Sequence, residues 1–297
     1  MVRELAALYE RLAIGALRDD DVVPLDVTRN EGNPQFLRYG INTGVIDQPE
    51  ALVFKHLTAE DGVILDVGAH WGYMAMSILN SGTTCPVLSF EAIPYTAHCL
   101  DVLRSISANF DFIISAASDA AREVVFYNPV VNGIPLSGLN SINGGTLDPW
   151  HVPFTVESIE KYMGASLRSG AQKLQLGVFK IEARTLDDLI ANRTFRFPVD
   201  HVAAIKIDVE GHDAAVLSGA RQTIRRNRPL LLVEGGSAPA IMSFMAAEGY
   251  RMVQKNDDHL VPLDGHQPAV NEFFVHSSKA NRFEKIGLLR GSGRSID

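Results

Sequence analysis

The 297-residue sequence has the composition of an ordinary globular protein, with 46% hydrophobic and 21% charged residues. Its formal net charge of -8 disfavours a nucleic-acid-binding surface, because phosphates would repel it and no basic patch dominates. No apolar run approaches the roughly twenty residues that a membrane-spanning helix needs. The sequence therefore predicts a soluble protein with a sizeable core, without a nucleic-acid partner or a membrane span.

The cysteines and the N-terminus bear on the cellular compartment. Cys85 and Cys99 have neither the spacing of a disulfide framework nor that of a metal site, so two free thiols are expected. The first residues carry charges among their leucines and lack the apolar stretch of a secretory signal peptide. A cytoplasmic location is therefore expected.

Residues 1–60 are predicted to form a helical extension. Leucine and alanine recur at helical spacing over residues 2–17, which predicts an amphipathic helix. Its apolar face is expected to pack on the core or on a second subunit, so a homodimer is an open alternative. Residues 19–44 are polar and interrupted by glycine and proline, so they are predicted to be loop with short pieces of structure. A second helix is predicted over residues 49–57.

The segment from Val63 to Met76 is an apolar run that breaks at two glycines and continues with helix-forming residues. This pattern predicts a buried strand, a tight turn and a helix. Gly68 and Gly72 lack a Cβ, so the backbone can approach a ligand closely, and the helix directs its free N–H groups to the same place. The spacing differs from the dinucleotide fingerprint, because His70 stands where a middle glycine would. A nucleoside site and tight helix–strand packing both remain open.

Strands and helices alternate after this turn, as expected of parallel strands joined by right-handed crossovers. Core strands are predicted over residues 87–91, 110–116, 202–208 and 230–234, and helices over 94–105, from 185, over 214–226 and over 238–248. An extra strand is predicted over 124–127, and hairpin-like strands over 251–254, 259–263 and 273–276.

The remaining segments are predicted to be less regular. Residues 128–146 are predicted to be loop. Residues 146–178 are predicted to form a cap over the site, and a helix over residues 157–167 of this cap is left as an open alternative. The tail beyond residue 286 is predicted to be disordered. No linker or repeat divides the chain, so 1–297 is predicted to be one domain, with a core over 61–278 and a tail over 279–297.

Four carboxylates are predicted to lie at the carboxyl ends of strands, where ligands bind in doubly wound sheets. They are Asp66, Glu91, Asp208 and Glu234. Glu91 lies about twenty residues past the glycine turn, where an acidic residue can accept both hydroxyls of a ribose. Each carboxylate alone could cap a helix or face solvent, but a shared ligand explains all four better.

Several motifs together resemble the FkbM family of S-adenosylmethionine-dependent methyltransferases. They are DVGAHWGY at 66–73, ASD at 117–119, TLDDL at 185–189, KIDVEGH at 206–212, the strand at 229–234 and NEFF at 271–274. The resemblance covers roughly residues 50–278. It implies a class I methyltransferase fold, Rossmann-like and doubly wound around a mostly parallel seven-stranded sheet. It also implies S-adenosyl-L-methionine as cosubstrate and methylation of a hydroxyl on a small molecule, such as a natural product or sugar.

The resemblance also implies roles for individual residues. The methionine and ribose portions would lie against Asp66, Gly68, Ala69, His70, Trp71 and Gly72, the ribose hydroxyls against Glu91, and the adenine edge against the backbone of Ala117 and Ser118. Asp208 would lie near the sulfonium, beside the acceptor, in keeping with the attraction of a carboxylate for a cation. His70 and Trp71 replace an asparagine and a smaller apolar residue common in the family, so contacts there are expected to differ.

An alcohol loses its proton on methylation, which requires a base within about 3 Å in the bound complex. His212 is the candidate base, because imidazole is competent near neutral pH and His212 follows Asp208 closely. Alternatively, His212 only contacts the start of the next helix. Asp208 and Glu234 are further catalytic candidates, and they leave open, without favouring it, a variant in which Mg²⁺ holds a diol acceptor.

Three other function classes compete with methyl transfer as explanations of the sequence. A dehydrogenase is disfavoured by the missing glycine and by the absence of a Tyr-x-x-x-Lys pair. A hydrolase is disfavoured because Gly235-Gly236-Ser237 lacks the second glycine of a nucleophile elbow. A catalytically weak scaffold that binds the cofactor and engages a partner through residues 146–178 remains open.

Overall fold

The computed structural model describes residues 7–8, 10–12, 14–25, 32–135, 141–142, 173–263 and 269–291. The chain divides into two compact units. The smaller unit comprises Met1–Val27, Arg122–Glu182 and Glu210–His212, and the larger unit comprises Thr28–Ala121, Ala183–Val209 and Asp213–Asp297. The expectation of one domain over the whole chain stays a prediction.

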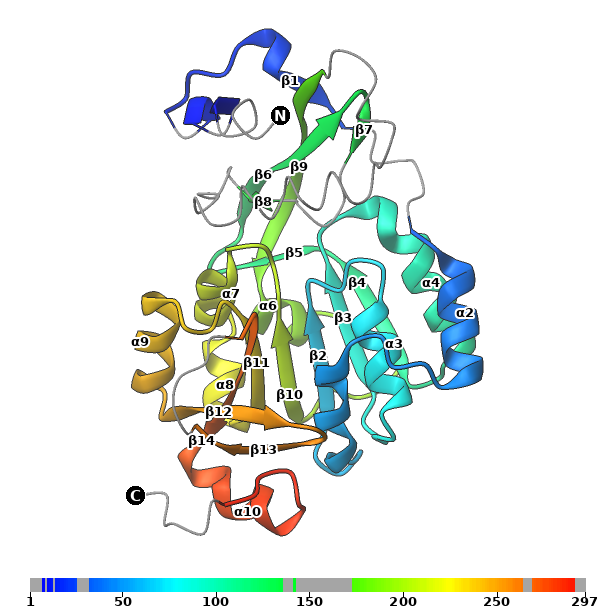
Figure 1. The fold of residues 1–297 in the computed structure, drawn as a ribbon, viewed down its shortest axis with the longest axis vertical. Coiled ribbons are helices and arrows are strands. Elements are labelled where there is room, and N and C mark those ends of the chain that lie inside the picture. Colours follow the sequence, from blue (N-terminus) through cyan, green and yellow to red (C-terminus); the bar gives the residue numbers. More distant parts are fainter. Residues whose placement is uncertain are drawn as a thin grey trace. The chain divides into compact units, whose positions relative to one another are not determined.

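The larger unit is built on an eight-stranded sheet with the order β13-β12-β14-β11-β10-β2-β3-β4 (Figure 1). The strands are β2 (Val63–Val67), β3 (Val87–Glu91), β4 (Phe110–Ile114), β10 (Val202–Ile207), β11 (Leu230–Glu234), β12 (Tyr250–Asn256), β13 (His259–Pro262) and β14 (Asn271–His276). The strands from β4 to β11 pair in parallel, and β14 is antiparallel to both β11 and β12. The predicted mostly parallel sheet is confirmed, with β13 as an eighth strand where seven were expected.

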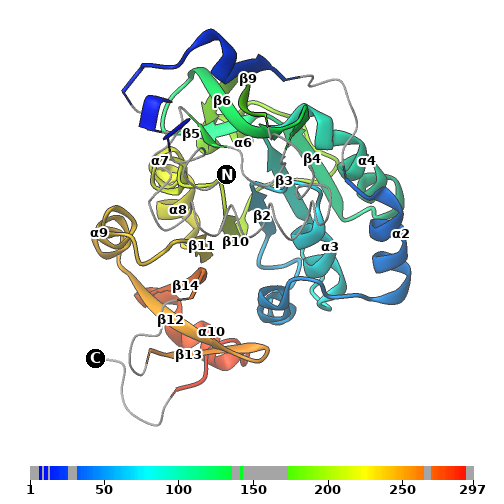
Figure 2. The ribbon, with the colours of Figure 1, turned by 45° about the horizontal axis from the view of Figure 1, so that its top comes forward.

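Helices cover both faces of this sheet, as its continuous apolar strands require. They are α2 (Pro34–Thr43), η2 (Pro49–His56), α3 (Tyr73–Asn80), η3 (Pro94–Thr96), α4 (Ala97–Ile106), α6 (Leu186–Ala191), α7 (Asp213–Gly219), α8 (Arg221–Asn227), α9 (Pro239–Ala247), η5 (Ser277–Lys279) and α10 (Ala280–Lys285). Ile64 packs in the cluster that includes α2, η2, α3 and α4, whereas its neighbour Leu65 packs with α6 to α9 (Figure 2). This alternation along β2 makes the sheet doubly wound.

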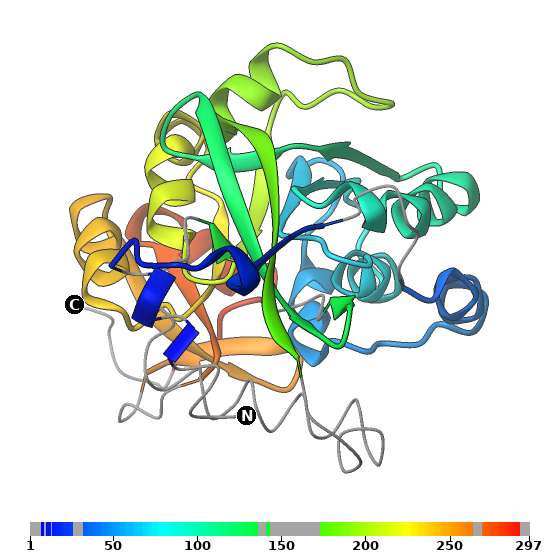
Figure 3. The ribbon, with the colours of Figure 1, turned by 90° about the horizontal axis from the view of Figure 1, so that it is seen from above.

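The smaller unit contains the long strands β6 (Arg122–Val131) and β9 (Leu174–Thr185), which are hydrogen-bonded neighbours (Figure 3). β1 (Val22–Pro24) follows η1 (Asp19–Asp21) and pairs in parallel with β9, and the short β7 (Ile134–Pro135) and β8 (Ser141–Ile142) pair with β6. The rings of Phe126 and Phe179 stack with their centroids 5.1 Å apart. The last residues of β9 belong to the larger unit, where they pair with β5 (Ala116–Ser118).

The structure corrects the prediction of loop over residues 128–146. β6 continues to Val131 and β7 and β8 follow it. Residues 174–178, assigned to the cap, are instead the start of β9. Most of the rest of the predicted cap, including the alternative helix over 157–167, lies outside the described residues. Most of the predicted helix over residues 2–17 also lies outside them. Residues 7–8 and 10–12 are helical, as expected.

The prediction of loop over residues 19–44 misses the ten-residue helix α2. The Asn33 side chain caps its start by accepting a hydrogen bond from the Phe36 N–H at 3.1 Å, and Pro34 occupies the first turn. Gly44 ends the helix in a left-handed conformation, with φ 71°. The proline and glycine therefore mark the two ends of a helix, where they were interpreted as signs of a loop.

The prediction of a disordered tail beyond residue 286 is wrong as far as residue 291. Leu288 and Leu289 are buried, and Leu288 accepts a hydrogen bond from the Leu260 N–H at 2.8 Å. Residues 292–297 lie outside the described part of the chain. The helix predicted over 214–226 is divided at Ala220 into α7 and α8, and the helix α10 was not predicted.

Two further expectations concern the cysteines and membrane spans. Cys85 and Cys99 are both buried free thiols, as predicted. Within the described ranges, the helices are too short or too polar to traverse a bilayer. The other predicted strands and helices of the core are present close to their expected bounds.

Candidate active site

The turn between β2 and α3 has a backbone shape that depends on glycine. Gly68 has φ 80°, and a Cβ there would lie 1.8 Å from the backbone oxygen of Asp208. Gly72 has φ 86°, and a Cβ there would lie 2.7 Å from Leu103. His70, between them, is also left-handed, with φ 50°. The turn is therefore packed closely against the end of β10 and against Leu103, and only glycine fits at these two positions.

His70 and Trp71 carry polar atoms that lack a partner. Their rings stack with centroids 4.3 Å apart, and burial lowers the pKa of His70 to about 4, helped by the charge of Lys206. His70 is therefore neutral at physiological pH. Its Nε2 and the Trp71 Nε1 are buried, and neither has a hydrogen-bond partner among the described residues. Buried polar groups are normally satisfied, so both atoms suit a bound polar ligand.

Glu91 ends β3 beneath the glycine turn and is only 5% exposed. Its Oε2 accepts a hydrogen bond from the His70 N–H at 2.5 Å, and its Oε1 accepts one from the Ile93 N–H at 2.7 Å. Burial raises the pKa of Glu91 to about 7, although these N–H donors favour the ionised form. Glu91 therefore joins the turn to β3 with a carboxylate whose ionisation is finely balanced near neutral pH.

Lys206 lies in the middle of the site and is 3% exposed. Its Nζ lies 3.4 Å from Asp66 Oδ1 and 3.3 Å from Asp208 Oδ2, and it donates a hydrogen bond to the backbone oxygen of Gly68 at 3.0 Å. Asp66 is fully buried and its Oδ2 accepts a hydrogen bond from Ser89 Oγ at 3.1 Å. Asp66 and Lys206 are cross-strand partners on β2 and β10. One ammonium group thus connects two strand ends and the glycine turn.

The charges of this network support one another. Burial would lower the pKa of Lys206, but Asp208 and Asp66 hold it above its ordinary value. Burial would likewise raise the pKa of Asp208, but the Lys206 ammonium and a hydrogen bond with Glu234 hold it below its ordinary value. Both groups are therefore charged at neutral pH.

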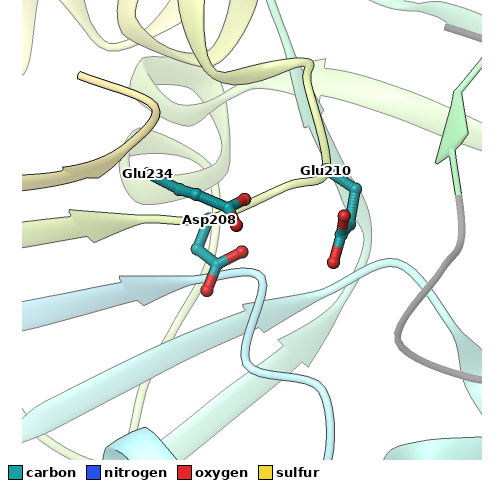
Figure 4. A group of neighbouring side chains, drawn as sticks. All are labelled: Asp208, Glu210 and Glu234. Carbon is teal, nitrogen blue, oxygen red and sulfur yellow. The ribbon is translucent and has the colours of Figure 1, made fainter. Parts of the chain in front are cut away.

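Asp208 directly follows strand β10, and Glu234 is the last residue of β11, the parallel strand beside it. Figure 4 shows both side chains, together with that of Glu210 two residues further along the chain. Asp208 and Glu234 are half-buried, and each offers an oxygen within 4.8 Å of the other. Of the four carboxylates predicted to share a ligand, these two are the ones that reach the surface. They give the strand ends a negative potential that suits a cation.

The other predicted site residues fall into two groups. Ala117 and Ser118 are buried in β5, just after β4, and a Cβ on Gly219 of α7 would lie 1.9 Å from the Ser118 backbone oxygen. His212 belongs to the smaller unit, where it is half-buried. The roles assigned to these three residues stay predictions.

Lys206 was missed by the sequence analysis. The signal was a single lysine within the apolar strand Val202–Ile207, two residues before Asp208. A charge inside a buried strand needs a partner, and Asp66 occupies the equivalent position on the neighbouring strand.

The part of the chain that holds this site matches a known family. The sequence pattern of the Methyltransferase FkbM domain matches residues 66–252, from Asp66 through the glycine turn and Glu91 to Lys206, Asp208 and Glu234. This chain belongs to the FkbM family of methyltransferases. Its membership confirms the resemblance drawn from the motifs. No curated protein sequence matches the chain.

Three solved structures are similar to this chain at low sequence identity, and the names of two of them are those of methyltransferases. A methyltransferase FkbM from Methylobacillus flagellatus KT is 13% identical with a TM-score of 0.42, over 91% of this chain and 58% of that one. A precorrin-6y C5,15-methyltransferase from Geobacter metallireducens GS-15 is 10% identical, with a TM-score of 0.33 over 87% and 94% of the two chains. The cofactor-bound Rv0187 from MTB is 11% identical, with a TM-score of 0.32 over 82% and 90%. This FkbM chain thus spans little more than half the length of the Methylobacillus protein.

Proposed function

We propose that this FkbM protein transfers a methyl group from S-adenosyl-L-methionine to a hydroxyl of a small molecule, such as a natural product or sugar. The observation that carries the proposal is the pair of accessible carboxylates, Asp208 and Glu234, beside a turn whose His70 and Trp71 side chains each hold a buried polar atom without a partner among the described residues. A ligand with a positively charged sulfur and an α-amino group complements that charge.

The residues of the site fit this cofactor. The unpartnered Nε2 of His70 and Nε1 of Trp71 are suited to polar groups of its methionine portion, which would lie along the glycine turn. Glu91 would accept the ribose hydroxyls, and the backbone of Ala117 and Ser118 would meet the adenine edge. Asp66 would act on the methionine portion chiefly through Lys206, because its own carboxylate is fully buried. When bound, the cofactor supplies a methyl group already activated by the sulfonium charge.

The protein's own part in the reaction is to position the acceptor, exclude water and take up a proton. Orientation alone can supply a large share of the acceleration of a transfer between two bound groups. Asp208 and Glu234 would hold the acceptor hydroxyl, with Lys206 keeping Asp208 ionised. His212 would remove the hydroxyl proton. The Val209 N–H donates to Asp213 Oδ1 at 3.2 Å, so the residues on either side of the segment that carries His212 are tied together.

Binding of S-adenosylhomocysteine is the first test. A ligand that binds only the folded protein stabilises it by about 2.7 kcal/mol at a hundredfold excess over its Kd. The melting temperature should therefore rise by several degrees. A melting temperature unchanged at millimolar ligand would refute the proposal. Binding without turnover on a panel of hydroxylated acceptors would favour the catalytically weak scaffold instead.

Replacing His212 by alanine tests its assignment as the base. Loss of a general base lowers turnover by about 10²–10⁴-fold, whereas binding of S-adenosylhomocysteine should stay within twofold of the unaltered protein. Release of S-adenosylhomocysteine from an acceptor identified in the panel measures the turnover. His98→Ala, on helix α4, is the matched control. Equal turnover in the two variants would exclude His212 as the base.

A Mg²⁺-dependent transfer to a diol is the second candidate, and the adjacent oxygens of Asp208 and Glu234 are the observation in its favour. Against it, the Lys206 ammonium already lies 3.3 Å from Asp208 Oδ2 and satisfies much of its charge. Full activity in excess EDTA would exclude the metal.

A further inference from the structure

A polar cavity lies in the larger unit at the amino ends of the parallel strands. Its volume is about 260 Å³, and the first residues of β10, together with Asp61 just before β2, contribute to its lining. The carboxyl ends of the same strands carry Asp66, Asp208 and Glu234. The cavity is therefore at the opposite edge of the sheet from the candidate active site.

Cationic side chains dominate the lining of this cavity. Arg226 comes from the last turn of α8, Arg228 follows that helix, Lys279 ends η5, and Arg282 lies on α10. The anionic side chains that line it are those of Glu60 and Asp61. This leaves an excess of two positive charges, in a chain whose net charge is -8.

The ion pairs of the described residues leave three of these four cations without an anionic partner. Arg282 pairs with Asp61, whose Oδ2 also accepts hydrogen bonds from the N–H and Oγ1 of Thr58 at 2.9 and 3.2 Å. Arg226, Arg228 and Lys279 form no ion pair with any other residue that the structure describes. The C-terminal end of α8 attracts Arg226, but it does not account for Lys279, which another element supplies.

The backbone at Arg228 gives a second, independent indication. Arg228 is left-handed, with φ 51° and ψ 54°, at a helix end where glycine or asparagine is usual. A side chain with a Cβ makes this conformation less favourable. The arginine nevertheless donates from Nη1 to Ser278 Oγ at 3.1 Å, which directs it to the segment that carries Lys279. The left-handed helix end thus brings a third guanidinium group to the lining of the cavity, beside the segment that carries Lys279.

We propose that this cavity binds the phosphate group of a phosphorylated small molecule. A phosphate dianion would neutralise the excess of two positive charges, and guanidinium groups pair with phosphate oxygens through two parallel hydrogen bonds. The volume lies just below the roughly 300–1,000 Å³ of pockets for drug-sized ligands, so the cavity holds the phosphorylated end while the rest of the molecule lies outside. The site is separate from the methyltransferase function proposed above.

Titration with inorganic phosphate and with glycerol phosphate, followed by ³¹P NMR and calorimetry at low ionic strength and pH 8, tests this proposal. We expect saturable binding with one site in the unaltered protein. The double variant Arg226→Ala/Lys279→Ala should bind both probes at least tenfold more weakly. The matched control is Arg251→Ala/Lys173→Ala, which removes the same charge from exposed residues that do not line the cavity and should bind within twofold of the unaltered protein.

Three results would overturn the proposal. They are the absence of saturable binding, equal weakening in the two double variants, and tighter binding of citrate than of phosphate. The stabilisation by S-adenosylhomocysteine, measured on the same samples, should be the same in both double variants, which shows that each is folded. Phosphate is titrated without the cofactor, so the absence of phosphate binding would refute this proposal alone. The methyltransferase proposal is tested separately by the stabilisation with S-adenosylhomocysteine.

Discussion

Replacing Lys206 by methionine is expected to lower the free energy of unfolding by about 3–5 kcal/mol at neutral pH, the cost of leaving a buried charge without its partner. Methionine retains the length and apolar stem of lysine but not its ammonium group. Asp66, which is fully buried, would keep only the hydrogen bond from Ser89, and Asp208 would lose its nearby cation. Urea unfolding, analysed as a two-state transition, measures the change.

A matched control separates this effect from the general loss of a lysine. Lys180→Met removes the partner of Glu123 on the surface, where the side chains are 64% and 59% exposed, and should leave the midpoint of urea unfolding nearly unchanged. Adding Asp66→Asn to Lys206→Met should recover part of the loss, because a neutral amide needs no cation. Equal losses for Lys180→Met and Lys206→Met would show that the network contributes nothing beyond a surface ion pair.

The effect of Lys206→Met also depends on pH in a defined direction. The folded protein holds the pKa of Asp208 below its ordinary value, so this pair stabilises the fold above pH 4 and ceases to do so as the pH falls through the folded pKa. The difference between the variant and the unaltered protein should therefore shrink in acid. A difference that stays constant from pH 7 to pH 3 would contradict an electrostatic origin.

The sequence predicts the core of this fold because its strands are local, continuous apolar runs. β2, β3 and β10 are buried along their whole length. Glu91 ends β3 and Asp208 directly follows β10, as predicted, whereas Asp66 lies inside β2, one residue before its end. The contact between Asp66 and Lys206 was not predicted, since it arises only when β10 pairs beside β2. A hydrophobicity pattern gives the faces of a strand but not its neighbours in the sheet.

The missed elements have a similar cause. Leu288 and Leu289 looked like part of a flexible tail, but they are buried through pairing with Leu260, far away in the sequence. β6 includes Asn128 and Pro129, residues that normally interrupt strands. The strand forms because β9, β7 and β8 of the smaller unit pair with it. Tertiary pairing thus overrides the local signals that favoured loop.

Affinity for S-adenosylhomocysteine is expected to increase with pH through neutrality because of Glu91. A ribose hydroxyl donates more strongly to a carboxylate than to a carboxylic acid, and burial raises the pKa of Glu91 to about 7. At pH 6 binding must first remove a proton, so the Kd should be about tenfold higher than at pH 8. His70 does not titrate in this range, because burial lowers its pKa to about 4. Calorimetry at several pH values measures the dependence.

Glu91→Gln should remove this dependence and weaken binding at pH 8 by about tenfold to a hundredfold, the value of one hydrogen bond to a charged group. The amide also places an N–H group opposite the backbone donor of either His70 or Ile93, so stability falls by about 1–3 kcal/mol. Glu284→Gln, on the exposed face of α10, is the control and should alter neither quantity. A steep pH dependence that survives in Glu91→Gln would assign the titration to another group.

Ionisation of Glu91 with rising pH should lower the stability of the ligand-free protein and increase its affinity for the cofactor. Its folded pKa lies above its unfolded value of 4.5, so the ligand-free protein binds more protons than the unfolded chain between these values. Stability should accordingly fall by up to about 3 kcal/mol as the pH rises from 4.5 to 7, while cofactor affinity increases. If Glu91 holds the ribose, saturating S-adenosylhomocysteine should therefore offset this loss. A ligand-induced rise in melting temperature that is identical at pH 6 and pH 8 would place the ribose away from Glu91.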